Sequence, residues 1–158
     1  MHRRSLLAAA LLTALPVPRS VLAHHGWSSF DQGRPLYLEG RATKVAWRNP
    51  HAEFMLEVKP DLALPADLAR RPVPAQSAGV DGPGLLARTQ LPRRKDRVWE
   101  IELAPLTRMQ AWQVPQLTNG TEVAVVGFTF DGEQGKPVLR AEYLWVGGKA
   151  YGMRSSPA

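Results

Sequence analysis

The chain has 158 residues, 20 of them Lys or Arg and 14 of them Asp or Glu, and it contains no cysteine. This length suffices for one domain with its own hydrophobic core. The lack of cysteine excludes disulfides, thiolate metal sites and thiol chemistry, so any metal would be held by imidazole, carboxylate, thioether or backbone nitrogen.

Residues 1–23 have the pattern of a secretory signal peptide. A basic start with Arg3 and Arg4 precedes an apolar run from Leu6 to Leu15, which is much shorter than the ~20 residues of a membrane span. Val21 and Ala23 then stand where a signal peptidase reads small residues. We therefore expect cleavage after Ala23, a periplasmic or secreted protein, and no stable membrane insertion after processing.

Two export routes fit this signal. The sequence Arg3-Arg4-Ser5-Leu6-Leu7 resembles a twin-arginine signal, and Arg19 adds a positive charge before the cleavage site. An ordinary signal that begins with two arginines explains the same residues equally well. Either way, three arginines and no acid are removed, so 17 basic and 14 acidic residues remain. This near balance argues against nucleic acid as a partner.

The mature chain begins with a predicted N-terminal tail at residues 24–35, followed by a long strand from Leu36 to Trp47. The apolar residues of this strand change face at Gly40, which predicts a bend or bulge at that glycine. After a turn at Asn49-Pro50, apolar and charged residues alternate from Glu53 to Lys59 and predict a second strand.

A third strand is predicted where the apolar residues Trp99, Ile101 and Leu103 alternate with Glu100 and Glu102. Such alternation is typical of a strand with one face on the core and the other in water. We therefore expect both glutamates to face solvent.

A short helix and two further strands complete the predicted elements. The helix runs over 105–112, with Pro105 in its first turn. Turn sequences such as Asn119-Gly120 precede a fourth strand at 122–128 and a fifth at 138–146. Residues 149–158 are expected to form a frayed C-terminal tail.

Residues 60–96 have a different composition from the rest of the chain. They hold six of the 14 prolines and the basic cluster Arg93-Arg94-Lys95. We interpret them as a long flexible insertion between the second and third strands, with one helical turn at 66–70.

The order of these elements predicts a mainly β fold in a single domain at residues 36–148. Three strands, a helix and two strands, with a long bent first strand, are typical of a small OB-like five-stranded barrel with one short helix between strands three and four. A small β-sandwich with one helix is the alternative.

Three histidines, His24, His25 and His51, remain after removal of the signal. Cleavage after Ala23 would give His24 a free α-amine, which can chelate one metal ion together with the Nδ1 of its imidazole. The predicted tail is long enough to fold back and bring His24 or His25 to His51. An amine and two imidazoles in a T-shaped set suit Cu(II), whereas nothing in the spacing marks a tetrahedral zinc site. His25 offers a second mode of Cu(II) binding. In this mode the ligands are the N-terminal α-amine, the deprotonated amide of His25 and the His25 imidazole.

Two functions are compatible with these residues. The first is a periplasmic copper-binding protein for binding, storage or delivery, with a metal site at His24, His25 and His51 and with zinc as the second choice of metal. We do not expect an enzyme, although an open copper site allows redox activity. The second is a non-metal interaction module that binds an envelope partner protein or a small ligand, in which His51 only serves the Asn49-Pro50 turn.

Other candidate residues have structural explanations beside the functional ones. Asp31 either accepts a hydrogen bond from a metal-bound histidine or forms a turn. Trp27, Trp47 and Trp112 either line a stacking groove or belong to the core. A Ser/His/Asp triad is not expected, because no histidine follows His51.

Several of these motifs together resemble an uncharacterised family of small exported bacterial proteins. They are Ala23-His24-His25, Trp47-x-Asn49-Pro50-His51, Trp99-Glu100 and Gly120-Thr121-Glu122-Val123. That family reads A-H-H-S-F near the mature start, then W-x-N-P-H and a P-G-D-x-V turn. This chain departs from the pattern at Gly26-Trp27, at its Asn-Gly-Thr turn and in its long insertion. The resemblance implies export and a small β-barrel, and it assigns no function.

Overall fold

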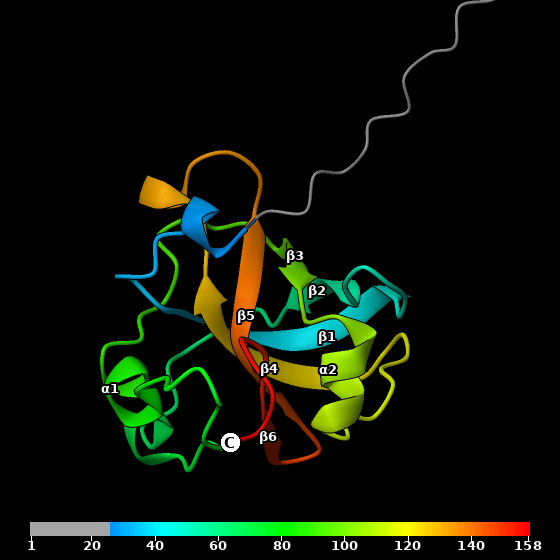
Figure 1. Ribbon diagram of the computed structural model, residues 1–158. Coiled ribbons are helices and arrows are strands. Elements are labelled where there is room, and N and C mark those ends of the chain that lie inside the picture. The colour runs from blue at the N-terminus through cyan, green and yellow to red at the C-terminus, as the bar shows by residue number, and fades with distance from the viewer. Residues whose placement is uncertain (1–25) are drawn as a thin grey trace, which may run out of the picture.

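The computed structural model describes residues 26–158, so the predicted signal peptide, His24 and His25 lie outside the described residues. The strands are β1 (Leu36–Ala46), β2 (Glu53–Val58), β3 (Val98–Glu102), β4 (Glu122–Phe128), β5 (Val138–Val146) and β6 (Lys149–Gly152). They form one sheet in the order β3-β2-β1-β4-β5-β6 (Figure 1). In addition, β3 pairs with β5, and this pairing closes five strands into a barrel. It is parallel, whereas the other strand pairings are antiparallel. The mainly β, OB-like barrel is thereby confirmed.

Short helices flank the barrel. They are α1 (Gly82–Ala87) and α2 (Leu106–Ala111), with the 3-10 turns η1 (Trp27–Ser29), η2 (Leu68–Arg70) and η3 (Asp131–Glu133). The helix α2 lies between β3 and β4 in sequence, as predicted, and Pro105 is its N-cap. Its residue Met109 packs into the barrel core. The helix α2 lies on the side of the barrel opposite α1 (Figure 1). Across residues 26–158 no helix has the length and hydropathy needed to cross a membrane.

The barrel interior is filled from alternate positions of the strands. Every second residue of β2 and β3 points inward, because successive side chains of a strand face opposite sides. The fully buried members of this core on those strands are Phe54, Leu56, Trp99 and Ile101. The outer face of the same strands carries the glutamates of β2 and β3 together with Met55 and Val98.

The bend of β1 lies at Lys44. The sequence pattern predicts it at Gly40, and that prediction is wrong. The register with β2 shifts between Thr43 and Ala46, and Lys44 has a φ of 47°. Gly40 has a different role, since a Cβ at this position would lie 2.0 Å from the carbonyl oxygen of Glu57. Only glycine therefore allows β1 and β2 to approach so closely here.

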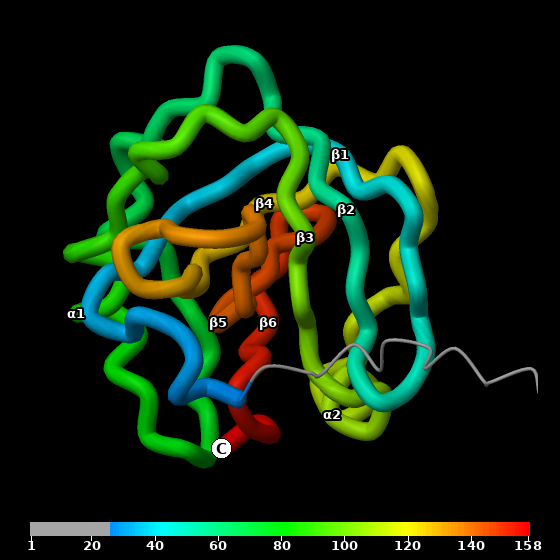
Figure 2. The backbone as a smooth tube through the Cα atoms, turned by 90° about the horizontal axis from the view of Figure 1, so that it is seen from above, coloured from blue at the N-terminus to red at the C-terminus, as the bar shows by residue number. Residues whose placement is uncertain are grey.

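The 60–96 segment packs against the outside of the barrel and contains both η2 and α1 (Figure 2). Its residues Leu68, Leu85 and Leu86 are buried in a second apolar cluster with Tyr37 and Phe128 of the barrel wall. This corrects the expectation of a flexible insertion. The buried leucines follow neither helical nor strand periodicity, so the sequence pattern did not reveal them.

The predicted C-terminal tail begins with β6, which adds an outer strand to β5. Gly147 and Gly148 both have positive φ and form the turn between the two strands. Beyond β6, Met153 is fully buried, and the Trp112 indole donates a 2.7 Å hydrogen bond to the carbonyl of Ser155. The end of the chain is thus part of the packed structure.

Candidate functional site

His51 lies at the entry to β2, directly after the Asn49-Pro50 turn. Hydrogen bonds from the Ala52 amide to the Ala104 carbonyl (3.1 Å) and from the Leu103 amide to the Ala52 carbonyl (2.9 Å) extend the β2–β3 ladder to this point. Ala52 is fully buried in the barrel core. Since side chains alternate along a strand, His51 belongs to the outer face of the barrel.

Glu102 of β3 lies on the same outer face as His51. Glu53 and Glu102 are direct partners in the β2–β3 register. His51 precedes Glu53 by two residues and lies just outside β2. The pairing shifts at Ala52, whose amide bonds to the Ala104 carbonyl instead of that of Leu103.

Glu102 is buried, with only 4% of its surface exposed, which corrects the expectation that it faces solvent. It lies opposite Arg140 in the parallel β3–β5 register, and the Arg140 guanidinium donates a 3.3 Å hydrogen bond to its carboxylate. Burial lowers the pKa of Arg140 despite the neighbouring carboxylate. The charge pair explains how a glutamate is accommodated in the barrel wall.

The N-terminal segment reaches the same region through Trp27. The Trp27 ring lies 5.2 Å from the guanidinium carbon of Arg140 and 3.9 Å from that of Arg154. It also meets the Phe128 ring edge-on, with 6.3 Å between the centroids. Arg154 is held by the buried carboxylate of Glu142 at 2.7 Å. Cation–π contacts thus dock the start of the described chain beside the Glu102–Arg140 pair.

Within the part of the chain that the structure describes, no group of three or more His, Asp or Glu side chains is arranged to hold a metal ion. Of the three predicted metal ligands, only His51 falls in that part. The other two predicted ligands, His24 and His25, precede residue 26.

The remaining candidate residues have structural roles. Asp31 forms a turn, in which its carboxylate accepts a 3.0 Å hydrogen bond from the Gly33 amide. Trp47 and Trp112 pack against the barrel core, whereas Trp27 packs on the outer cluster. The three tryptophans therefore do not form a common stacking groove.

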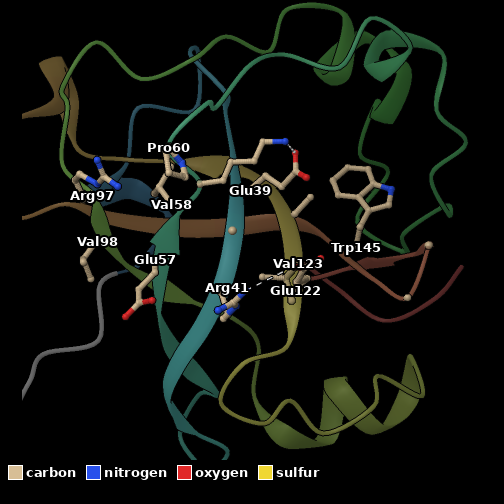
Figure 3. Close-up of a pocket in the computed structure, with 15 residues that line it drawn as sticks. Glu39, Arg41, Glu57, Val58, Pro60, Arg97, Val98, Glu122, Val123 and Trp145 are labelled. Atoms are coloured by element: carbon tan, nitrogen blue, oxygen red, sulfur yellow. Dashed lines mark ion pairs between the residues drawn. The ribbon is translucent and has the colours of Figure 1, made fainter.

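A separate pocket of about 690 Å³ crosses the outer face of the sheet (Figure 3). Gly40 of β1 is among its lining residues, and Trp145 and Arg97 lie at opposite sides of it. Three acidic and three basic residues line it, namely Glu39, Arg41, Glu57, Lys59, Arg97 and Glu122. Its lining contains no histidine, so the pocket is distinct from the His51 region.

Two ion pairs join four of the six charged residues of this pocket. Lys59 and Glu39 are 2.9 Å apart, and Arg41 and Glu122 are 4.0 Å apart (Figure 3). Burial by itself raises the pKa of Glu39, but hydrogen bonds from Tyr37 and Lys59 outweigh it and lower the pKa below its usual value. Sequence reasoning missed the pocket because alternating charges also occur on any solvated strand.

Comparison with known proteins gives one match. Residues 13–64 match the model of DUF6152, a family of unknown function. The matched segment contains His24, His25 and His51 and extends beyond β2, and it confirms the resemblance to an uncharacterised family. The searches of curated proteins and of solved structures found no match.

Proposed function

We propose that this chain, whose residues 13–64 match a family of unknown function, is an exported periplasmic copper-binding protein. After cleavage behind Ala23, His24 would supply its α-amine and imidazole to Cu(II), and His51 would supply the remote imidazole. His25 is an additional or alternative ligand. Binding, storage or delivery of copper is the activity that such a site suits.

The observation that carries this proposal is the position of Trp27. This residue follows His25 by two positions, and its ring rests on Arg140, whose guanidinium is bonded to Glu102. Glu102 is in turn paired with Glu53, two residues after His51, in the β2–β3 register. The start of the described chain, at Gly26 and Trp27, therefore packs beside the Glu102–Arg140 pair, and this position supports the proposed fold-back of the N-terminal tail.

The chemistry of the available donors favours copper over zinc. An amine and two imidazoles are nitrogen donors without a thiolate, and Cu(II) prefers such ligands in square or tetragonal geometry. A structural zinc site needs four donors in tetrahedral geometry, and nothing in the spacing of these residues marks such a site.

Titration of the processed protein with Cu(II) tests the proposal. We expect tight one-to-one binding with nitrogen hyperfine structure in the paramagnetic resonance spectrum. Because the α-amine is a ligand, a form that retains a methionine before His24 should keep its fold and lose most of its affinity. Equal affinity of the two forms, or affinity no higher than that of an unstructured histidine peptide, would contradict the proposal.

The variant His51→Ala tests the remote ligand. It should weaken Cu(II) binding and remove one imidazole from the spectrum, with little change in the stability of the metal-free protein. Arg48→Ala, an exposed change in the same turn, serves as the control. Affinity should also fall from pH 7 to pH 5, because free imidazoles and α-amines have pKa values near ~6.5 and ~8 and must lose their protons to bind metal.

The pocket around Gly40 supports a second candidate, a module that binds a small ligand without metal. Its balanced charges and the Trp145 wall suit a small zwitterionic or polar compound. A panel of amino acids and dipeptides can be titrated while the Trp145 indole and Gly40 amide resonances are followed. Shifts confined to these groups would support this function, and unchanged resonances with every compound would speak against it.

A further inference from the structure

We infer that the end of the barrel beside residues 91–97 holds a binding site for a small compound with an apolar body and an oxyanion head, either a carboxylate or a phosphate. The apolar body lies on leucine and valine side chains at the barrel end, and the oxyanion binds Arg97 and Lys95. The site does not depend on the proposed copper function, and its residues belong to the described part of the chain.

The site is a cavity of about 280 Å³ at the barrel end. This barrel-end cavity is lined by Leu38 of β1, by Val58 of β2 and by parts of the segments 59–62 and 91–97. Its volume is just below the ~300–1,000 Å³ that is typical of ligand pockets, and the mouths of β-barrels are one of the places where such pockets form. The cavity therefore suits a small compound.

The floor of the barrel-end cavity is apolar and continuous with the barrel core. Leu38 is fully buried in that core, and Val58 and Leu62 pack against it. Leu91 packs against the outer cluster. Val58 is the last residue of β2, and its amide donates a 2.9 Å hydrogen bond to the carbonyl of Arg97, directly before β3. The end of the β2–β3 ladder thus places the Arg97 cation at the edge of an apolar surface.

The cations of the barrel-end cavity are of two kinds. The paired ones are Arg94 with Asp96, at 2.6 Å, and Lys59 with Glu39, at 2.9 Å. Arg97 and Lys95, in contrast, are exposed, and neither forms a salt bridge with another residue of the described range 26–158. The cavity therefore presents two cations whose charge no carboxylate of that range neutralises.

This combination of surfaces determines the chemistry of the ligand. An arginine guanidinium can donate two parallel hydrogen bonds to a carboxylate or phosphate, whereas a lysine adds a point charge. An inorganic anion would leave the apolar floor exposed to water, and a neutral apolar compound would leave the two cations without a counter-charge. A compound that has both parts satisfies both surfaces.

The barrel-end cavity is adjacent to the pocket around Gly40 but can be distinguished from it. The two share the lining residues Val58, Lys59, Pro60 and Arg97, three of which Figure 3 labels together at one side of the pocket around Gly40. Leu62 and Leu91 line the barrel-end cavity alone, and Trp145 lines the pocket around Gly40 alone. Resonances of these three residues therefore report which of the two spaces a ligand occupies.

Titration of the metal-free protein with phenylacetate and with phenyl phosphate tests the inference. At least one of them should shift the Leu62 and Leu91 methyl resonances and leave the Trp145 indole unchanged, and the tighter of the two identifies the head group. Neutral phenylacetamide and inorganic phosphate should each bind at least about tenfold more weakly, because each lacks one of the two parts. Three outcomes would overturn the inference: no shift with either aromatic anion, shifts centred on Trp145, or equal binding of phenylacetamide or of inorganic phosphate, which would mean an adventitious ion only.

Two variants with matched controls assign the binding to named residues. Arg97→Gln should weaken binding of the aromatic anion by about tenfold or more. Arg93→Gln, an exposed change in the same segment outside the cavity, should leave it unchanged. Leu62→Ala should weaken it as well, and Leu64→Ala is its control, because Leu64 is 40% exposed and does not line the cavity. Equal losses in Arg97→Gln and Arg93→Gln would indicate general attraction to a basic surface and would contradict the inference. Cu(II) affinity should be the same in all four variants, so failure of this inference leaves the proposed copper function untouched.

Discussion

The side-chain amide of Gln76 donates a 2.8 Å hydrogen bond to the carboxylate of Glu142, and both groups are buried. The Gln76 oxygen accepts hydrogen bonds from the backbone amides of Arg154 and Ser155, at 3.0 and 3.1 Å. One glutamine therefore joins three parts of the chain, namely the 60–96 segment, β5 and the C-terminal residues.

Replacement of Gln76 by alanine should destabilise the protein by at least ~2 kcal/mol. The change leaves two backbone amides without their acceptor and removes one donor from a buried carboxylate, and unsatisfied buried polar groups cost ~1–3 kcal/mol each. Chemical denaturation of the metal-free protein measures the effect. Ser77→Ala, an exposed neighbour, is the control and should be close to neutral. A midpoint for Gln76→Ala equal to that of the control would show that this junction does not contribute to stability.

Deletion of residues 63–92 should unfold the protein or render it insoluble. The sequence pattern predicts a flexible insertion, and the length of such a loop has only a weak effect on stability. The structure reverses this expectation, since the deletion removes Leu68, Leu85 and Leu86 and exposes the barrel residues Tyr37 and Phe128. Circular dichroism and thermal unfolding of the shortened chain provide the measurement. A cooperative transition at the wild-type temperature would mean that the outer cluster is not needed.

Gly40→Ala should destabilise the barrel by at least about 2 kcal/mol, because the added methyl group would overlap the backbone of Glu57 and the two strands would have to move apart. Gly26→Ala is a suitable control. Its φ is −67°, and the nearest atom to an added Cβ is 3.8 Å away. Denaturation midpoints of the two variants make the comparison, and equal midpoints would contradict the close approach of β1 and β2.

Glu133 should make stability depend on acidic pH. Burial alone would raise the pKa of Glu133, but hydrogen bonds from the Arg93 and Arg94 amides and the ion pair with Arg34 outweigh burial and lower it. A lowered folded-state pKa stabilises the protein above the unfolded value near ~4.3. That contribution is lost as the pH falls through the folded-state pKa.

Denaturation midpoints of the wild type and of Glu133→Gln between pH 7 and pH 2 test this prediction. The two proteins should differ most at pH 7, and the difference should shrink at the acidic end of the range. Glu57→Gln, at an exposed position of β2, controls for the general effect of removing one negative charge. A constant difference between wild type and Glu133→Gln at every pH would rule out the ionisation of Glu133 as its cause.

Much of the secondary structure could be predicted from the sequence, because strand alternation and turn residues are local features. The strands predicted at 122–128 and 138–146 coincide with β4 and β5, and the predicted helix at 105–112 contains α2. The order of strands and helix then sufficed to predict the OB-like barrel. The site was predictable only as a set of histidines, since no local pattern states which barrel face the N-terminal segment contacts.

The amino-acid sequence by itself thus determined the five barrel strands, the helix between β3 and β4, their order and the three candidate ligands. Only the tertiary structure decided that Glu102 is buried, because the arginine that balances its charge comes 38 residues later, on β5. The same holds for the 60–96 segment, whose leucines find apolar partners on a barrel wall that exists only after closure. Burial of a charge or of an isolated leucine depends on contacts between distant residues, and local periodicity carries no information about such contacts.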